Sequence, residues 1–528
     1  MSAAAGRIGL FIGGAIALAV LCLLWPAAAA TVEILRAAAW ETAAMSPRRW
    51  MLLGRGVDVA LRSGAVATIL GGGLAVGLAA RSAAARWTCA AVGLVVLLTP
   101  PYVYAYAWSL PALPGGLLTA QVLSRDQYEL VTRWRATWCL GTWSAPLAAA
   151  VIFSGWQGTA RRVYQLALLD ASPARALLRG ALPTMTPAVL AAFGLSAGLA
   201  LSEFSVCHLC LVQTWNTEIL AEAQLGRAGT ALLLGWPLAA AVGAVVLALL
   251  PVRKRLAELL ARLSGNAATS RVETAATRQW PGLVVAGLAA AVLLLPWAVY
   301  LSYLSEPAAL LRAWRTFVMQ RDQAPALPYA VAAAVAGVWL ALGVDFLLGP
   351  RRADWPVVLR GAGWAIALAA LAAALMPPVV VGDAFVAAYH QAPAVYDHWP
   401  ILSLALAARL AIVPIGLLVA ARARVDGYAG MAAADGASWW QCCRQVRWPL
   451  MRGALMKGGL LVAVLALTEV AVSQMVTPPS VNNVARRLLN EIHFGRNDDV
   501  IALSLYMTAL AALGAGGLLA TAGRRARL

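Results

Sequence analysis

Long apolar segments recur along the whole chain, and they constrain its fold more than any other feature. About twelve of them have the length of a helix that crosses a bilayer, roughly 20 residues. A soluble protein cannot bury so many such segments, because the buried fraction of a chain rises slowly with its size. The composition, 62% hydrophobic and 12% charged, also excludes a disordered chain. We therefore expect an all-α integral membrane protein. The segments are 8–30, 57–79, 88–110, 136–157, 187–211, 228–250, 281–304, 326–348, 357–381, 399–421, 453–476 and 498–521.

The first segment allows two interpretations. Arg7, the apolar run and the small residues Ala27 to Ala30 have the pattern of a cleaved signal peptide. However, the apolar part is longer than in most signal peptides, and a retained helix gives two halves of six spans each. We favour the retained helix.

The basic residues predict the orientation of the chain. The net charge is +18, and nearly all of this excess falls on alternate loops when the N-terminus is placed inside. Cytoplasmic loops of membrane proteins carry such an excess of Lys and Arg. A nucleic-acid-binding protein would instead gather its positive charge on one soluble face. We expect both termini in the cytoplasm, lipid around the spans and no nucleic-acid partner.

The second half of the chain repeats features of the first. An Ala-Ser pair, a Pro, a Glu and an Asn recur at one constant offset of 266 residues. Because each half has an even number of spans, the halves are expected to be parallel repeats. We predict a first repeat at 1–250 and a second at 281–528, joined by a basic cytoplasmic linker at 251–280. The matched residues are Ala171-Ser172 with Ala437-Ser438, Pro183 with Pro449, Glu203 with Glu469 and Asn216 with Asn482; upstream, Leu98-Thr99-Pro100-Pro101 resembles Leu375-Met376-Pro377-Pro378 at a different offset.

Two cytoplasmic loops, 158–186 and 422–452, are more patterned than a turn requires. Each has an Ala-rich helical piece, a break, and then an amphipathic piece that contains Arg and leads to a Pro. Asp and Ser at the break are natural N-caps, and the Pro is expected to stop the piece or direct the chain into the next span. We expect two short helices at an angle, lying across the membrane surface. The residues of this pattern are Asp170, Ala171, Ser172 and Pro183 in the first loop, and Asp435, Gly436, Ala437, Ser438 and Pro449 in the second.

These two loops resemble the coupling loop of ABC importer permeases, the EAA motif, in which Glu-Ala-Ala is followed by three residues, a Gly and a distant Pro. The chain is similar to the fused, two-repeat permeases of the ferric-iron uptake type. Thr468-Glu469-Val470, leading to Thr477-Pro478-Pro479, is similar to a stretch of those permeases. The resemblance covers nearly the whole chain as architecture, whereas its specific residues are confined to the two loops and the helix after each.

The chain departs from that motif in two ways. The motif's Glu is absent, and Tyr164 and Gly430 occupy the aligned places. Its Gly survives as Gly436, while Asp170 takes that place in the first loop. We therefore expect unequal contacts at the two loops. Docking of a helix in a groove remains plausible without the Glu, since it depends on shape and an apolar ridge.

The resemblance implies the ABC type I importer permease fold in a bacterial inner membrane. It implies a cytoplasmic ABC ATPase, expected as a dimer, which docks on both loops and holds ATP and Mg. It also implies a periplasmic or extracellular binding protein that delivers the substrate. Ferric iron is the expected substrate, with thiamine, polyamines and oxyanions as alternatives. The sequence contains no Gly-x4-Gly-Lys-Ser/Thr phosphate-binding motif, so we expect neither enzymatic activity nor a cofactor in this chain.

Charged residues within the spans are candidates for the transport path. Glu203 and Glu469 lie at equivalent positions, and a carboxylate in a span usually faces a cavity or a partner. They either line the outer mouth of the path as gate or cation-attracting residues, or serve as structural caps near the headgroups. Arg409 needs a counter-charge, either Glu469 or Glu203, and we favour an ion pair between helices over a substrate site. Asp345, at a span end, is expected to be solvated.

One short pattern suggests a metal site only weakly. Cys207, His208 and Cys210 carry side chains that suit transition metals. No second ligand pair has the spacing of a zinc site, and Cys-x-x-Cys on a helix is also ordinary small-residue packing. We favour packing.

Two other functions remain as alternatives. An ion-coupled secondary transporter would use Glu203, Glu469 and Arg409 as an ion or proton relay, and inverted repeats would favour it. A structural membrane subunit would transport nothing. The parallel repeats and the paired loops favour the permease.

Overall fold

The computed structural model describes residues 2–36, 44–112, 125–241, 243, 280–315, 323–348, 357–438, 441–493 and 497–523. Within these ranges every regular element is helical, as the sequence predicts. The predicted linker 251–280 lies, apart from its last residue, outside the described residues. Residues 242 and 244–250 of the predicted span 228–250 also lie outside the described residues.

The helices follow one another with short connections, and π or 3-10 segments are labelled η. The first repeat contains α1 (Ser2–Ala19), η1 (Val20–Leu24), α2 (Trp25–Arg36), α3 (Pro47–Leu78), α4 (Ala83–Leu98), α5 (Pro101–Ala107), η2 (Leu110–Ala112), α6 (Arg125–Gly155), η3 (Trp156–Ala160), α7 (Arg161–Ala167), α8 (Pro173–Arg175), η4 (Ala176–Ala181), α9 (Leu182–Ser202), α10 (Ser205–Leu209), α11 (Trp215–Gln224) and α12 (Ala228–Leu234). The second repeat contains α14 (Trp280–Tyr303), α15 (Ala308–Arg312), α16 (Gln323–Leu347), α17 (Val357–Leu375), α18 (Pro378–Tyr389), α19 (Pro393–Tyr396), α20 (Pro400–Leu410), α21 (Ile412–Ala434), η7 (Cys442–Arg447), α23 (Trp448–Thr468), α24 (Ala471–Val476), α25 (Val484–His493) and α26 (Asn497–Gly523).

These are the helices of a multi-pass membrane protein. In the described ranges nine are long and apolar enough to cross a bilayer, or up to eleven if each of two bent pairs is one span. Large apolar side chains such as Ile69, Leu190 and Leu513 are exposed on the helices, which a soluble protein would avoid over so large an area. The solvent around these helices is therefore lipid.

Two predicted spans are broken rather than continuous. The segment 88–110 divides into α4 and α5, which meet at 91°. Two prolines stand at this break, Pro100 and Pro101, and proline cannot donate the backbone bond that would continue the helix. The segment 399–421 divides into α20 and α21, bent by 41°. Apolar length alone therefore did not predict these bends.

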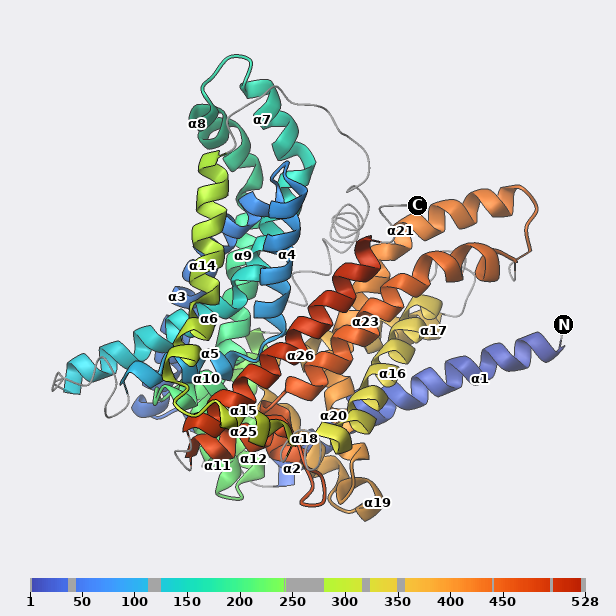
Figure 1. Cartoon of the computed structure of the whole chain (residues 1–528). Helices are drawn as coiled ribbons and strands as arrows, with labels where there is room; N and C mark the ends of the chain where they lie inside the picture. The colour runs from blue at the N-terminus through green and yellow to red at the C-terminus, as the bar shows by residue number, and fades with distance from the viewer. Residues whose placement is uncertain are drawn as a thin grey trace.

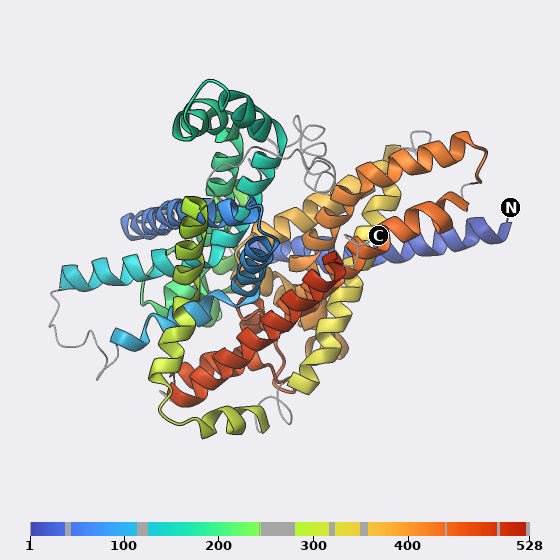
Figure 2. The same ribbon diagram turned by 45° about the horizontal axis from the view of Figure 1, so that its top comes forward.

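The helices form two bundles that diverge from one end of the molecule (Figure 1). The bundles remain distinct when the molecule is turned (Figure 2). One bundle is built around α3, α4, α6, α9 and α14, and the other around α1, α16, α17, α20, α21 and α23.

Each bundle contains the first helix of the other repeat. A Cβ atom built on Gly77 of α3 would lie 2.9 Å from the Ala286 Cβ of α14. A Cβ atom built on Gly343 of α16 would lie 2.6 Å from the Ala15 Cβ of α1. Gly77 and Gly343 differ by the repeat offset of 266, so the same close approach holds α14 on the first bundle and α1 on the second.

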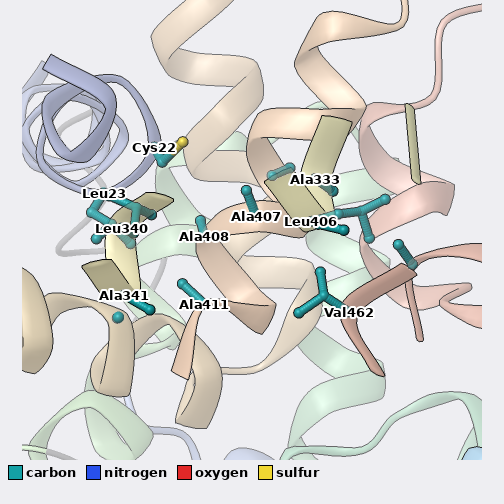
Figure 3. Packing of buried hydrophobic residues seen from close by; sticks show 14 of the residues in the cluster. Cys22, Leu23, Ala333, Leu340, Ala341, Leu406, Ala407, Ala408, Ala411 and Val462 are labelled. Carbon is teal, nitrogen blue, oxygen red and sulfur yellow. The ribbon is translucent and has the colours of Figure 1, made fainter. Parts of the chain in front are cut away.

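The exchanged N-terminal segment is part of the core of the second bundle. Cys22 and Leu23 of η1 are buried in the same apolar cluster as Leu340 and Ala408. Figure 3 shows these side chains beside one another. The segment also makes a close backbone approach at Gly343 and Ala15, the kind of contact that small residues permit in a membrane.

The offset of 266 also relates a hydrogen bond in each bundle. Ser63 Oγ donates to the Thr137 carbonyl at 3.2 Å. In the second bundle Ser403 Oγ donates to the Tyr329 carbonyl at 3.2 Å. The two pairs occupy matched positions with donor and acceptor exchanged. A hydrogen bond therefore joins α3 to α6 in one bundle and α16 to α20 in the other at equivalent residues.

Apolar clusters join the repeats: one packs α4 against α23 and α26, and two more lie at one end of the molecule. One cluster joins Tyr102 and Tyr106 of α5 to Leu488 of α25. Another joins Trp215 of α11 to Val379 of α18. We call this end, in the lower part of Figure 1, the contact end. We call the other end, from which two helical hairpins project, the hairpin end.

The first and the last described helices, α1 and α26, each have one end at the hairpin end. Phe11 of α1 contacts Phe346, near the last turn of α16. Trp25, further along the same segment, donates to the Ala388 carbonyl near the contact end. At the other terminus, α26 begins at the contact end, where Asp498 accepts a hydrogen bond from Ser305, and runs toward the hairpin end (Figure 1).

Candidate functional site

The first hairpin (residues 156–181) lies between α6 and α9. It consists of η3, α7, α8 and η4 and projects at the top of Figure 1. Asp170 and Ala171 form the turn, and Ser172 takes the N-cap position of α8 without a side-chain cap. The predicted break is therefore present, whereas the predicted Ser cap is not formed.

The second hairpin (residues 422–438 and 441–447) consists of the second part of α21 and of η7, at the matched place before α23. Asp435 ends α21, and Gly436 follows with a φ of +87°, a conformation that favours glycine. Ser438 then caps the next piece reciprocally: its Oγ accepts from Gln441 N at 3.3 Å, and its N donates to Gln441 Oε1 at 2.8 Å. This is the capping geometry that the sequence predicts at the break.

The two prolines of the pattern do not end their helices. Pro183 and Pro449 lie in the first turn of α9 and α23, directly after the π segments η4 and η7. The wider π turn accommodates the carbonyl that a proline leaves without a partner. Each hairpin therefore continues directly into the following span. Of the two roles predicted for the prolines, the structure has the second, in which the Pro leads the chain into the next span.

The hairpins carry exposed apolar side chains between basic residues. Leu169 at the first tip has 79% of its surface exposed, and Met431 in the second hairpin has 57%. Arg162 and Arg179 belong to the first hairpin and Arg444 to the second. Such a ridge of apolar side chains with basic neighbours suits a groove on a protein partner.

The two predicted carboxylates stand at helix breaks, not within helices. Glu203 ends α9 with extended backbone angles (φ −83°, ψ 127°), and Glu469 ends α23 in the same way (φ −77°, ψ 122°). Each is followed by a short helix, α10 or α24. The spans 187–211 and 453–476 are therefore not continuous helices, because in each the carboxylate side chain takes over backbone donors.

Each carboxylate caps the short helix that follows it. Glu203 Oε1 accepts from the N and Oγ of Ser205. Glu469 Oε2 accepts from Val472 N at 2.9 Å and from Ser473 N at 3.2 Å. The structural alternative for these residues, capping, is thus formed at both sites. The two carboxylates also interact electrostatically across the repeats.

Arg409 has the counter-charge that the sequence requires. Its Nε lies 3.8 Å from Glu469 Oε1, and both side chains are largely buried. Its Nη1 donates to the Met376 carbonyl at 3.0 Å. The structure therefore selects Glu469 over Glu203 as the partner of Arg409.

Trp143 holds the place of Arg409 in the first repeat, at the same offset of 266. Its Nε1 donates to the Thr99 carbonyl at 3.0 Å. Thr99 and Met376 each precede a Pro-Pro pair, which leaves their region of the helix without its usual donors. Trp143 and Arg409 thus donate equivalent hydrogen bonds, but Trp143 is neutral and Arg409 is positively charged. Among the described residues, no Arg, Lys or His nitrogen is within 4 Å of the Glu203 carboxylate.

No protein-family model, curated protein or solved structure matches this chain.

Tyr102 is a functional candidate that the sequence reasoning missed. Its ring is buried in the contact between the repeats, and its hydroxyl lies 3.5 Å from the Thr468 carbonyl, directly before Glu469. It lies near both carboxylates, Glu469 and Glu203. The sequence feature that could have indicated Tyr102 is its position directly after Pro100-Pro101, because the helix break at these prolines turns α5 across the end of α23. Tyr102, Glu203, Glu469 and Arg409 together form what we call the central polar cluster.

The Cys-x-x-Cys pattern lies near this cluster but is part of the apolar core. Cys207 and Cys210 are buried and pack with Cys139 of α6. No group of three or more His, Cys, Asp or Glu side chains in the described ranges is arranged to hold a metal ion. His208 instead lines a shallow pocket with Arg48 and Glu218.

Proposed function

We propose that the chain is the membrane-spanning permease subunit of an ATP-driven ABC importer. The observation that carries this proposal is the pair of hairpins, which occur at matched positions of two repeats and project from the same end of the molecule. A motor that pulls on both hairpins can move the two bundles relative to one another. Movement of two halves around a central site is the general form of alternating access.

The energy for transport comes from another polypeptide in this proposal. The sequence lacks a phosphate-binding Gly-x4-Gly-Lys-Ser/Thr motif. ATP and Mg therefore belong to a separate ATPase, expected as a dimer that contacts one hairpin with each subunit. The hairpin end then faces the cytoplasm of a bacterium, and a binding protein delivers substrate at the contact end from outside the inner membrane.

The central polar cluster is the gate on the outer side in this proposal. It lies where the repeats are in contact, and it holds two carboxylates but one arginine. Because Arg409 neutralises Glu469, the charge that remains is that of Glu203. This balance favours a cationic substrate over an oxyanion, and ferric iron is the substrate that the resemblance implies.

Co-purification tests the proposal. The chain is purified in mild detergent from its native membrane, and we expect a separate ATPase that hydrolyses ATP to accompany it. Leu169→Asp and Met431→Asp place a charge on the apolar ridge of each hairpin and are expected to release the ATPase. The control is Leu225→Asp at the contact end, a leucine whose exposure lies between those of Leu169 and Met431; this variant is expected to retain the ATPase.

The same purified material also distinguishes the permease function from that of an ion-coupled transporter. The buried pair of Arg409 and Glu469 is the observation that favours the latter function. In sealed vesicles, uptake that requires ATP and the ATPase supports the permease. Uptake driven by a proton or ion gradient alone, with no ATPase bound to the intact hairpins, would overturn it.

A further inference from the structure

Four charged side chains join the second hairpin to α16. Arg422 of α21 lies 3.7 Å from Asp345 of α16 and 3.1 Å from Asp426, measured between its nitrogens and the carboxylate oxygens. Asp426 pairs in turn with Arg447 of η7. We call these residues the four-charge cluster. It links three segments, α16, α21 and η7, at the point where the hairpin leaves the bundle.

The cluster is shielded from solvent and includes a backbone anchor. Each of its four side chains has less than a quarter of its surface exposed. Arg422 also donates from Nη2 to the Leu348 carbonyl at 2.6 Å, just after the end of α16. The prediction of a solvated Asp345 was therefore wrong, since this carboxylate is 7% exposed. The sequence could not identify Arg422 as the partner of Asp345, because the two residues lie in helices that are far apart along the chain.

The first hairpin has no such cluster at the matched positions. The offset of 266 places Ala79, Trp156, Ala160 and Ala181 where the second repeat has Asp345, Arg422, Asp426 and Arg447. Ala160 and Ala181 are buried, and Trp156 packs on the Tyr164 ring at 5.4 Å. This joint consists of small apolar contacts, which are not directional and permit sliding.

A shielded set of ion pairs is directional in a way that apolar contacts are not. Separating its members leaves charges without partners in a region of low dielectric, which is costly. Arg422, through its pair with Asp345 and its hydrogen bond to the Leu348 carbonyl, therefore opposes a change in the angle between the second hairpin and α16. α16 in turn packs on the exchanged helix α1 at Gly343 and Ala15, so a displacement of this hairpin reaches α1 as well.

We propose that the four-charge cluster is a positioning device, which makes the second hairpin and α16 move together when a motor acts on the hairpin. The first hairpin moves without a matching link to α3. The inference rests on the proposed function, because it treats the hairpins as the contacts of a motor. It adds that the two repeats respond unequally to that motor.

Hydrogen exchange of the full chain in lipid nanodiscs tests the link without requiring transport. We expect Asp426→Asn to accelerate exchange by at least about tenfold both in 427–434 of the second hairpin and in 343–348 of α16. Exchange in 161–167 of the first hairpin should not change. Asp426→Glu, which keeps the charge, should restore slow exchange in both segments. The matched control is Arg444→Gln, which removes an exposed arginine of the same π segment.

The outcomes distinguish this inference from the proposed function. If neither Asp426→Asn nor Arg422→Gln, which removes both contacts of Arg422 with α16, accelerates exchange in 343–348, the link to α16 is refuted even where the ATPase still binds. If no ATPase binds the wild-type chain, the proposed function fails, and exchange in 343–348 still decides whether the cluster couples hairpin and helix. Arg422→Gln removes the ion pair with Asp345 and the hydrogen bond to the Leu348 carbonyl. It serves if Asp426→Asn does not fold, with the same acceleration expected in 427–434 and 343–348.

A functional readout separates positioning from simple stability. In the complex with its ATPase, Asp426→Asn should retain ATPase binding and lower the substrate moved per ATP hydrolysed by several-fold. Asp426→Glu should recover that ratio. A variant that loses ATPase binding and transport together, with unaltered exchange in 343–348, would instead place Asp426 in the docking surface and overturn the proposal.

Discussion

Trp143 and Arg409 occupy the same position in the two repeats, and each donates one hydrogen bond of 3.0 Å to the carbonyl that precedes a Pro-Pro pair. Only Arg409 brings a charge to this place, and among the residues that the structure describes only the carboxylate of its repeat, Glu469, is paired with a cation. The duplicated architecture is thus retained while its electrostatics differ between the halves.

Replacing Arg409 should destabilise the chain through both of its contacts. Arg409→Ala removes the donor to Met376 and leaves the Glu469 carboxylate without its counter-charge. We expect a loss of about 2–4 kcal/mol in the free energy of unfolding, seen as a lower Tm in detergent. Glu469→Gln combined with Arg409→Ala should cost less than the sum of the two single changes, because the pair interacts. Additive losses would contradict the ion pair.

Arg409→Trp serves as the control for the hydrogen bond. It copies the first repeat, so the donor to the Met376 carbonyl is retained while the charge is lost. We expect a loss of stability smaller than that of Arg409→Ala. Equal losses would show that the carbonyl contact contributes nothing measurable.

Glu203 and Glu469 should respond differently to neutralisation. Glu203→Gln keeps an oxygen that can accept from Ser205, and Glu203 has no cation within 4 Å in the described residues to leave unpaired. We expect little change in Tm, and a fall in uptake of a cationic substrate of about tenfold, the effect of losing roughly 1.4 kcal/mol of attraction. Glu469→Gln should instead lower Tm, because Arg409 remains buried. Uptake is measured in vesicles that contain the binding protein and the ATPase.

Sequence reasoning predicted the helical class, the membrane setting and the presence of a carboxylate counter-charge for Arg409. Each of these depends on a local or periodic property: apolar length, or a charge within a span. The contacts across the chain were not accessible in this way. Glu469 and Glu203 were equal candidates for Arg409 because equivalent positions look alike in sequence, and only the packing of α20 against α24 selected one.

The helix breaks were missed for a related reason. A window of apolar residues that includes Glu203 or Glu469 still has the hydropathy of a span, so the pattern predicted one helix. The break depends on the backbone donors that the carboxylate captures, one at Glu203 and two at Glu469. Tyr102 was missed because its role comes from the 91° turn of α5, which the Pro-Pro pair permits but does not direct.

The packing of α1 on the second bundle can be tested by a substitution that creates a steric clash and a second substitution that removes it. Gly343→Ala places a methyl group 2.6 Å from the Ala15 Cβ, closer than such atoms approach. We expect a loss of about 1–3 kcal/mol from overpacking. Ala15→Gly in the same chain should recover most of it, because it removes the opposing methyl. Gly416→Ala is the control, since a Cβ there meets nothing within 4 Å. Failure of Ala15→Gly to restore Tm would show that α1 does not pack on α16.

Asp383 should make stability depend on pH. It lies in α18, outside the candidate spans, and 5% of its surface is exposed. Burial raises the pKa of this carboxyl from 3.8 to about 7, and its Oδ2 has no hydrogen-bond partner among the described residues. Between these two values the folded chain binds a proton that the unfolded chain has lost, so stability falls as the pH rises through this window and levels off above it.

Asp383→Asn should remove this dependence. The amide cannot ionise, so the variant pays no penalty for a buried charge at pH 7 and above. There we expect it to be more stable than the wild type by up to about 4 kcal/mol, with the difference shrinking to near zero at about pH 4. The measurement is Tm in detergent across that range for both chains. A wild-type Tm that rises steadily from pH 4 to 7, with Asp383→Asn parallel to it, would contradict the assignment, because a carboxyl whose pKa is raised by burial can only lower stability as it ionises.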